Sequence, residues 1–136
     1  MRARLALAVI VAAFVPQAAS ASCAAPEWDV DNDRAQTGES ITISGRFFID
    51  GCNDTGSASW CGGPAPQEPE VPMTGIRFQL LGGDESVDAV TVSADEQGDV
   101  AATLTVPQDA KAGAYKVVAT YFGQGQEAVP VRVTAD

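Results

Sequence analysis

Apolar and polar side chains alternate with a period of two residues along most of this chain. Six segments show the alternation, and their apolar members are Ile41, Ile43 and Phe47; Ile76, Phe78 and Leu80; Val90 and Val92; Val100, Ala102, Leu104 and Val106; Tyr115, Val117, Ala119 and Tyr121; and Val129, Val131 and Val133. Successive side chains of an extended strand point to opposite faces, so each segment is expected to bury one face. Most of these residues are β-branched or aromatic, as strands favour.

Turn-forming residues separate these segments. Residues 82–85 read GGDE, residues 95–99 read DEQGD and residues 123–125 read GQG, which is the chemistry of turns. A further strand is expected around Trp28 and Val30. About seven short strands at close spacing predict an all-β fold, an antiparallel β-sandwich.

Two places are expected to depart from this regular pattern. Pro130 has no backbone N–H to donate to a ladder, so the last strand is expected to lie at an edge or to contain a bulge. The stretch from Asp50 to Gly75 is rich in Gly, Pro, Ser and acidic residues and contains Trp60. It is too long for an ordinary hairpin connection, and long loops of compact domains often carry function. Residues 50–75 are therefore the predicted binding loop.

The first 21 residues have the order of a secretory signal peptide. Arg2 and Arg4 are followed by an apolar run from Leu5 to Val15, and small residues lead to Cys23. A run of this length is too short to span a bilayer. We therefore expect residues 1–21 to be removed and residues 22–136 to form one domain outside the reducing cytosol, extracellular or lipid-anchored at the outer face of the cell membrane.

The charge balance constrains the partners. Without Arg2 and Arg4, 6 of the 8 basic residues remain against 18 acidic ones, a net charge of −12. Such a surface repels the phosphates of nucleic acids and of anionic lipids. Contact with a membrane is expected only through a lipid anchor, and the partner is expected to be an unidentified protein or small ligand.

Export to an oxidising compartment determines which states of the three cysteines we expect. Cys52 and Cys61 are separated by eight residues and are expected to form a disulfide that contributes about 2–3 kcal/mol by the chain-entropy argument. Cys23 is left over. It resembles the lipid-bearing cysteine of bacterial lipoproteins, but Ser20 stands where that motif has Leu. Cleavage after Ala21 without lipidation is the alternative, and both readings stay open.

Between Gln36 and Val133 the chain resembles a bacterial immunoglobulin-like domain of exported and cell-surface proteins. The carrying segments are residues 38–45 (GESITISG), 94–100 (ADEQGDV) and 106–107 (VP) with 112–115 (AGAY). The resemblance implies an immunoglobulin-like sandwich of about seven strands. It also implies that Tyr115 is a tyrosine corner whose hydroxyl bonds a backbone group upstream. Val117 stands where the second cysteine of the antibody-type disulfide would be.

Candidate ligand groups lie at two places. Asp29, Asp31 and Asp33 alternate as calcium ligands can, but Arg34 and Ser40 exclude an EF-hand loop; another calcium site would recruit Asp50, Asp54, Glu68 or Glu70. A solvated acidic turn is the alternative. Trp60, with Asp50 and Asp54 nearby in sequence, could present a ring to a ligand, whereas Trp28 is expected to pack in the core.

Catalysis finds little support in the sequence. The chain has no histidine, which removes the Ser-His-Asp and Cys-His arrangements and the commonest zinc ligand. We therefore expect that the protein is not an enzyme, that it has no catalytic residues and that it binds no cofactor other than calcium. The expected role is non-catalytic, binding or structural, at the cell surface. A secreted module for calcium or a small ligand and a carboxylate-dependent hydrolase remain as alternatives.

Overall fold

The chain folds into two facing β-sheets. The computed structural model describes residues 24–51, 69–121 and 127–135. Its strands are β1 (Glu27–Val30), β2 (Arg34–Gln36), β3 (Ser40–Arg46), β4 (Ile49–Asp50), β5 (Val71–Pro72), β6 (Ile76–Gly82), β7 (Glu85–Val92), β8 (Val100–Thr105), β9 (Gly113–Thr120) and β10 (Ala128–Thr134). None of the described residues forms a helix, so none of them supplies an apolar helix long enough to cross a membrane.

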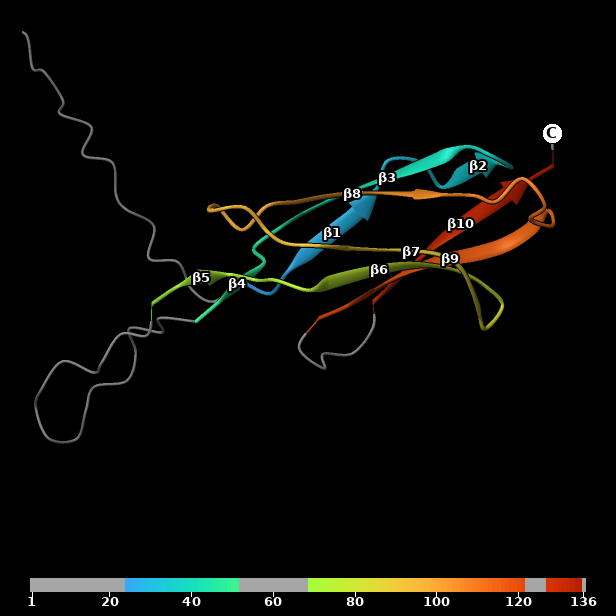
Figure 1. Ribbon diagram of the computed structural model, residues 1–136. Helices are drawn as coiled ribbons and strands as arrows, with labels where there is room; N and C mark the ends of the chain where they lie inside the picture. Colours follow the sequence, from blue (N-terminus) through green and yellow to red (C-terminus); the bar gives the residue numbers. More distant parts are fainter. Residues whose placement is uncertain (1–23, 52–68, 122–126, 136) are drawn as a thin grey trace, which may run out of the picture.

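The strands form two layers and a small third ladder (Figure 1). One sheet has the order β1-β3-β8 and the other the order β2-β10-β9-β6-β7, while β4 pairs with β5 at one end. All pairings are antiparallel except that of β2 with β10, which is parallel. The predicted all-β sandwich is therefore confirmed. The three short strands β2, β4 and β5 were not expected.

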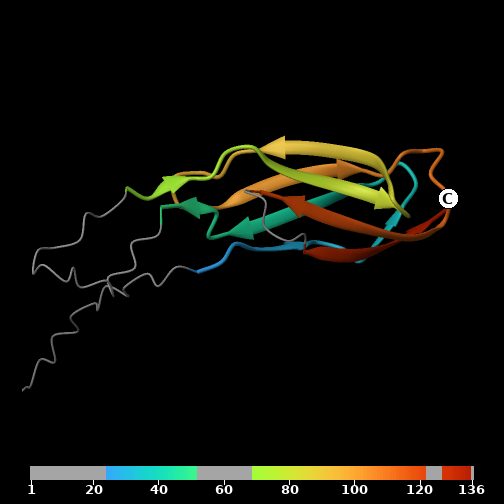
Figure 2. The same cartoon turned by 90° about the horizontal axis from the view of Figure 1, so that it is seen from below.

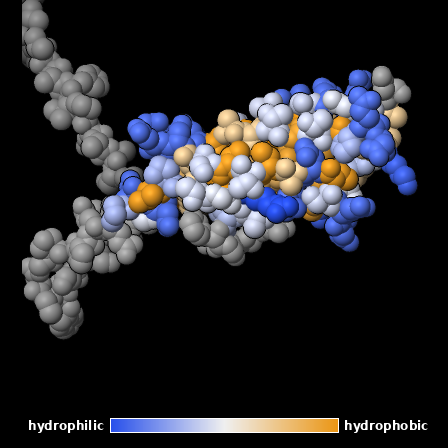
Figure 3. Space-filling model, in the orientation of Figure 1, coloured by the Kyte–Doolittle hydropathy of each residue, from blue (hydrophilic) through white to orange (hydrophobic). Residues whose placement is uncertain are grey.

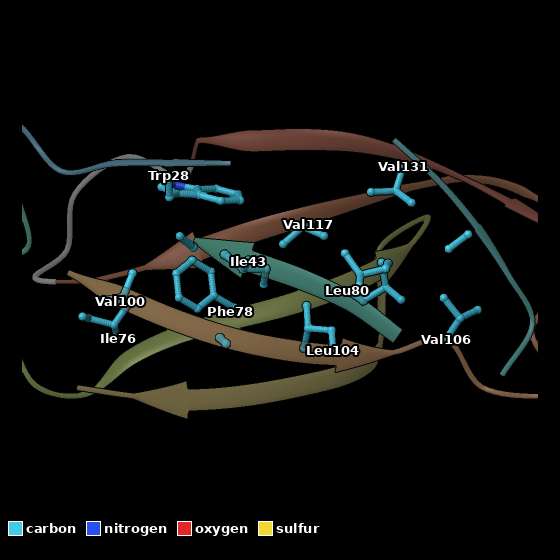
Figure 4. Close-up of a cluster of buried hydrophobic side chains, with 14 of the residues drawn as sticks. Trp28, Ile43, Ile76, Phe78, Leu80, Val100, Leu104, Val106, Val117 and Val131 are labelled. Atoms are coloured by element: carbon cyan, nitrogen blue, oxygen red, sulfur yellow. The ribbon is translucent and has the colours of Figure 1, made fainter. Parts of the chain in front are cut away.

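Alternate side chains from both sheets fill the space between the layers (Figure 4). The fully buried residues include Ile41, Ile43, Ile76, Phe78, Leu80, Leu104, Val106, Val117 and Val133. All of these belong to the apolar sets that the alternation predicts. In the space-filling view, hydrophobic residues are visible along the middle of the sandwich, and hydrophilic residues gather towards both of its ends (Figure 3).

Trp28 anchors one end of this core. Its ring is only 8% exposed and meets the Phe78 ring edge-on, with centroids 5.4 Å apart and planes at 66°. Such pairs add about 0.5–1.5 kcal/mol to the burial of the rings. The expectation that Trp28 packs in the core is confirmed, although its Nε1–H has no hydrogen-bond partner among the described residues.

The alternation breaks after β3. The expectation that Phe47 faces the core is wrong: Phe47 is 38% exposed, and Phe48 is fully buried in its place. Phe47 has a φ of 65°, which turns the chain so that the next side chain points inward. The Phe48 ring then lies over Gly45, where a Cβ would come within 2.7 Å of the ring and 2.9 Å of Trp28 Cβ.

The last strand meets the expectation about Pro130 only in part. β10 lies inside its sheet, between β9 and β2. Pro130 pairs with Lys116 of β9 on one side, whereas β2 pairs only with residues Arg132 to Thr134. Pro130 thus lies beyond the end of β2, where no ladder partner needs its missing N–H.

The two sheets are also joined by polar contacts at their margins. Asp88 in β7 accepts a hydrogen bond from the backbone N–H of Thr105 in β8 through Oδ2, at 2.6 Å. Its Oδ1 accepts from the backbone N–H of Ala89 at 2.9 Å. One carboxylate therefore links the outermost strand of the larger sheet to the outermost strand of the smaller one.

Replacing Gly45 by alanine tests the packing of Phe48. We expect Gly45→Ala to lower the free energy of unfolding by about 2 kcal/mol, because the new methyl group overlaps the Phe48 ring and the Trp28 side chain. The control is Gly113→Ala, since a Cβ at Gly113 meets nothing within 4 Å; it should cost nothing or stabilise slightly. Urea unfolding of both variants measures the difference, and equal stabilities would contradict this packing.

Candidate functional site

The two ends of the predicted binding loop meet at one end of the sandwich. Ile49 pairs with Pro72, and Asp50 pairs with Val71, so β4 and β5 form a small ladder that projects from the sheets (Figure 2). Gly51 has a φ of 85°, and a Cβ there would overlap the backbone oxygen of Pro69. The close approach at this glycine brings the chain before residue 52 against the chain after residue 68.

A series of backbone hydrogen bonds fixes this ladder to the sandwich. The N–H of Phe48 donates to Gly98 O, the N–H of Met73 donates to Phe48 O, and the N–H of Ala94 donates to Met73 O, each at 2.9 Å. Phe48 also meets the Tyr121 ring edge-on, with centroids 5.3 Å apart. The base of the loop is therefore held by four separate chain segments.

Two large hydrophobic side chains are exposed at this base. Phe47 is 38% exposed and Val71 is 52% exposed, and they are the exposed large hydrophobic residues of the described chain. A separate hydrophobic patch is visible at the β4–β5 end in Figure 3. Because both side chains flank the same ladder, we call Phe47, Val71, β4 and β5 the binding end.

Phe47 is held in its exposed position. The Arg46 guanidinium lies 4.9 Å from the centroid of the Phe47 ring. Arg46 in turn donates from Nε and Nη2 to Glu27 Oε2, at 3.0 and 2.7 Å. The ion pair is solvent-exposed and adds at most about 1 kcal/mol, but it fixes where the guanidinium stands. A non-glycine residue with φ near +65° costs about 1–2 kcal/mol, so the surface placement of this ring is maintained against strain.

An open groove runs beside Arg46. It has a volume of about 550 Å³ and is lined by residues of β1 and β3 together with Asp99 and Val100. Glu27, Asp29 and Asp99 make its wall predominantly acidic. Trp28 also lines the groove, so the groove lies next to the anchored end of the core.

Of the predicted ligand-binding residues Trp60, Asp50 and Asp54, only Asp50 can be placed. Asp50 lies in β4, exposed, and its Oδ1 accepts a hydrogen bond from the Gly51 N–H at 2.9 Å. Trp60, Asp54 and the expected pair Cys52 and Cys61 lie outside the described residues, as does Cys23. The disulfide, the lipidation and the Trp60 platform therefore stay predictions.

Of the three candidate calcium ligands, Asp29 lies in β1, and Asp31 and Asp33 lie where the chain crosses from one sheet to the other. Asp29 Oδ1 accepts from the N–H of Val30 at 2.8 Å, and Asp31 Oδ1 accepts from the N–H of Thr42 at 2.9 Å. Asp33 contributes its backbone oxygen to the N–H of Arg132 at 2.8 Å. Within residues 24–51, 69–121 and 127–135, no three acidic or cysteine side chains come together to hold a metal. A calcium site that uses Asp54 or Glu68 stays a prediction.

Sequence reasoning missed Phe47, Val71 and Tyr121 as residues of this end. The signal for Phe47 was present: two adjacent aromatic residues after Gly45 cannot both continue a two-residue alternation. Val71 stands beside Pro72 in a polar stretch and gave no such signal. Tyr121 is half-buried, and burial, with a smaller effect of the Glu127 carboxylate, raises its pKa above the usual 10.0.

The strain at Phe47 is measurable. We expect Phe47→Gly to be about 1 kcal/mol more stable than Phe47→Ala, because only the alanine keeps a Cβ at positive φ. Both variants lose the ring and its contact with Arg46, so their difference isolates the backbone. Urea unfolding of the two proteins provides the measurement. An alanine variant as stable as the glycine variant would show that the backbone there is not strained.

Alkaline pH should reveal the environment of Tyr121. A raised pKa in the folded state means that the neutral phenol stabilises the fold below about pH 10 and that this contribution disappears as pH rises through the folded-state pKa. Tyr121→Phe should therefore show a smaller loss of unfolding free energy between about pH 9 and pH 11 than the unmodified protein. Glu127→Gln should reduce the loss less, since burial is the larger cause. The same loss in all three proteins would contradict this assignment.

The binding end has to be interpreted from its own geometry. No family model matches the chain, and no curated protein matches it at a significant level.

Proposed function

We propose that the chain is an exported immunoglobulin-like domain of bacterial type with a non-catalytic binding or structural role at the cell surface. The strand arrangement supports the immunoglobulin-like type. The first extended segment divides between the sheets, with β1 paired to β3 and β2 paired in parallel to β10. The Tyr115 hydroxyl donates to the backbone oxygen of Lys111 at 3.0 Å, which is the upstream hydrogen bond expected of a tyrosine corner.

The first 21 residues support export. Their basic, apolar and small segments follow in the order of a signal peptide, and an oxidising destination suits a Cys52–Cys61 bridge. In this proposal the domain is either released outside the cell or held at the outer face of the membrane by a lipid on Cys23. The intact mass of the mature protein, with and without reduction, distinguishes a chain that begins at Ser22 from a lipid-bearing one and counts the disulfides.

The observation that carries the binding role is that the two exposed large hydrophobic residues of the described chain, Phe47 and Val71, both lie in or next to the β4–β5 ladder at the base of the 50–75 loop. Phe47 and Val71 lose contact with water when a partner covers them, which contributes about 25 cal/mol for each Å² of apolar area. The base is already fixed by backbone hydrogen bonds through Phe48 and Met73. A disulfide between Cys52 and Cys61 would lower the ordering cost of the loop still further.

Photo-crosslinking in the producing cell tests this role. A photoreactive residue at position 47 or 71 should form the same adduct, because a partner seated on the binding end covers both positions. The matched control is position 103, an exposed threonine of β8 on the far face of the smaller sheet. A crosslinking yield at position 103 equal to that at positions 47 and 71 would argue against a binding surface at this end. Adducts with different partners at positions 47 and 71 would also argue against it.

A further inference from the structure

The outer face of the larger sheet carries an unusual set of charges. Ala35, Phe78, Val117 and Val133 point into the core, so their strand neighbours point outward. Each of four successive strands presents one exposed cation on this outer face. They are Arg34 on β2, Arg132 on β10, Lys116 on β9 and Arg77 on β6.

No carboxylate accompanies these cations on the strands of that face. Of the residues in the five strands, only Glu85 and Asp88 are acidic. Glu85 lies at the turn, opposite Gly82, while Asp88 lies opposite Leu80 on the core side and bonds Thr105. The described residues include six basic and fifteen acidic ones. Four of the six cations therefore share one face, and the carboxylates occupy the turns and the other surfaces.

The fold itself does not require this arrangement. Arg34 and Arg132 are register partners, and like charges on adjacent strands repel. The ion pair of the described chain joins Arg46 to Glu27, so within the described residues none of the four cations has a carboxylate within ion-pair distance. Removing the repulsion would stabilise the sheet, which indicates that the cations serve something outside it.

The register gives the cations a definite layout. Lys116 pairs with Pro130, two residues from Arg132, so these two residues are diagonal neighbours whose Cα atoms lie about 7–8 Å apart. Arg77 pairs with Thr120, four residues along β9 from Lys116. At about 3.4 Å per residue and 4.8 Å per strand, the row crosses the sheet diagonally over about 25 Å. The outward residues beside the cations on β9 and β10 are neutral: Ala114, Ala128 and Pro130 are exposed, and Val118 is buried.

We infer that this row binds a linear phosphate polymer that lies across the strands. Three of the four cations are arginines, whose planar guanidinium groups match phosphate oxygens in pairs. Acidic residues stand at both ends of the strands, with Asp84 and Glu85 at the β6–β7 turn and Glu127 before β10. A planar anionic membrane would meet those carboxylates, whereas a narrow polymer that follows the diagonal row avoids them.

Nucleic acid fits the face less well than a polymer without bases. Single-stranded nucleic acid is held by aromatic side chains on which the bases stack. The outward residues of the five strands include no aromatic ring. The net negative charge of the chain does not forbid a local contact, since repulsion from distant carboxylates is screened beyond about 8 Å at physiological ionic strength.

Binding of labelled inorganic polyphosphate to the mature protein tests the inference. Fluorescence anisotropy should show binding that weakens as the salt concentration rises. A plot of the logarithm of the association constant against the logarithm of the salt concentration should have a slope of about −3, because each of the four phosphate contacts adds about −0.7 to the slope. The double variant Arg34→Gln, Arg132→Gln should bind about tenfold more weakly and reduce that slope by about half. Its unfolding free energy should not fall, because it removes a like-charge pair.

A matched pair of lysine variants locates the contact. Lys116→Gln and Lys111→Gln remove the same charge from exposed positions, but only Lys116 lies on the face. Lys116→Gln should weaken polyphosphate binding, and Lys111→Gln should leave it nearly unchanged. Equal losses in the two variants, or no binding by the unmodified protein, would overturn the inference. Tighter binding to single-stranded DNA or to anionic phospholipid vesicles than to polyphosphate would overturn the assignment of the polymer.

Discussion

The contact between the Phe48 ring and the bare backbone of Gly45 determines how this end of the molecule is built. Because the ring occupies the space of a missing side chain, Phe48 turns inward and Phe47 is forced out at positive φ. The backbone N–H of Phe48 donates a hydrogen bond to Gly98 O, and the backbone oxygen of Phe48 accepts one from the N–H of Met73. The small ladder that closes the 50–75 loop depends on those two bonds, so one close approach sets both the end of the core and the exposed ring.

Most of the layered architecture could be predicted because burial on one face leaves a regular trace in the sequence. The apolar sets around Ile43, Phe78, Leu104, Val117 and Val131 all reach the core. The short strands β2, β4 and β5 left no such trace, since two or three residues are too few to show a period. Their existence depends on pairing with distant segments, which a local pattern does not record.

For the candidate site, the sequence pattern indicates a position but not the residues that compose it. The long Gly- and Pro-rich stretch points to the region between Asp50 and Gly75, whereas the exposure of the Phe47 ring next to its base follows from tertiary packing. The alternating aspartates at 29, 31 and 33 resemble calcium ligands in the sequence, but in the structure Asp31 and Asp33 provide hydrogen-bond acceptors where the chain crosses between the sheets. The net charge is a sum over the whole chain, so it does not show that Arg34, Lys116 and Arg132 lie on the same face.

The Asp88 carboxylate has a consequence for how copies of this protein behave when they meet. β7 and β8 end their sheets side by side, and each would otherwise offer free backbone groups to a passing strand from another chain. Asp88 occupies the Thr105 N–H and places a negative charge at that opening, and the ladder of β7 is irregular close by, between Leu80 and Leu81 on its partner strand. A margin that is capped, charged and irregular in register is a poor template for edge-to-edge growth, so two copies of the sandwich gain little by pairing along it.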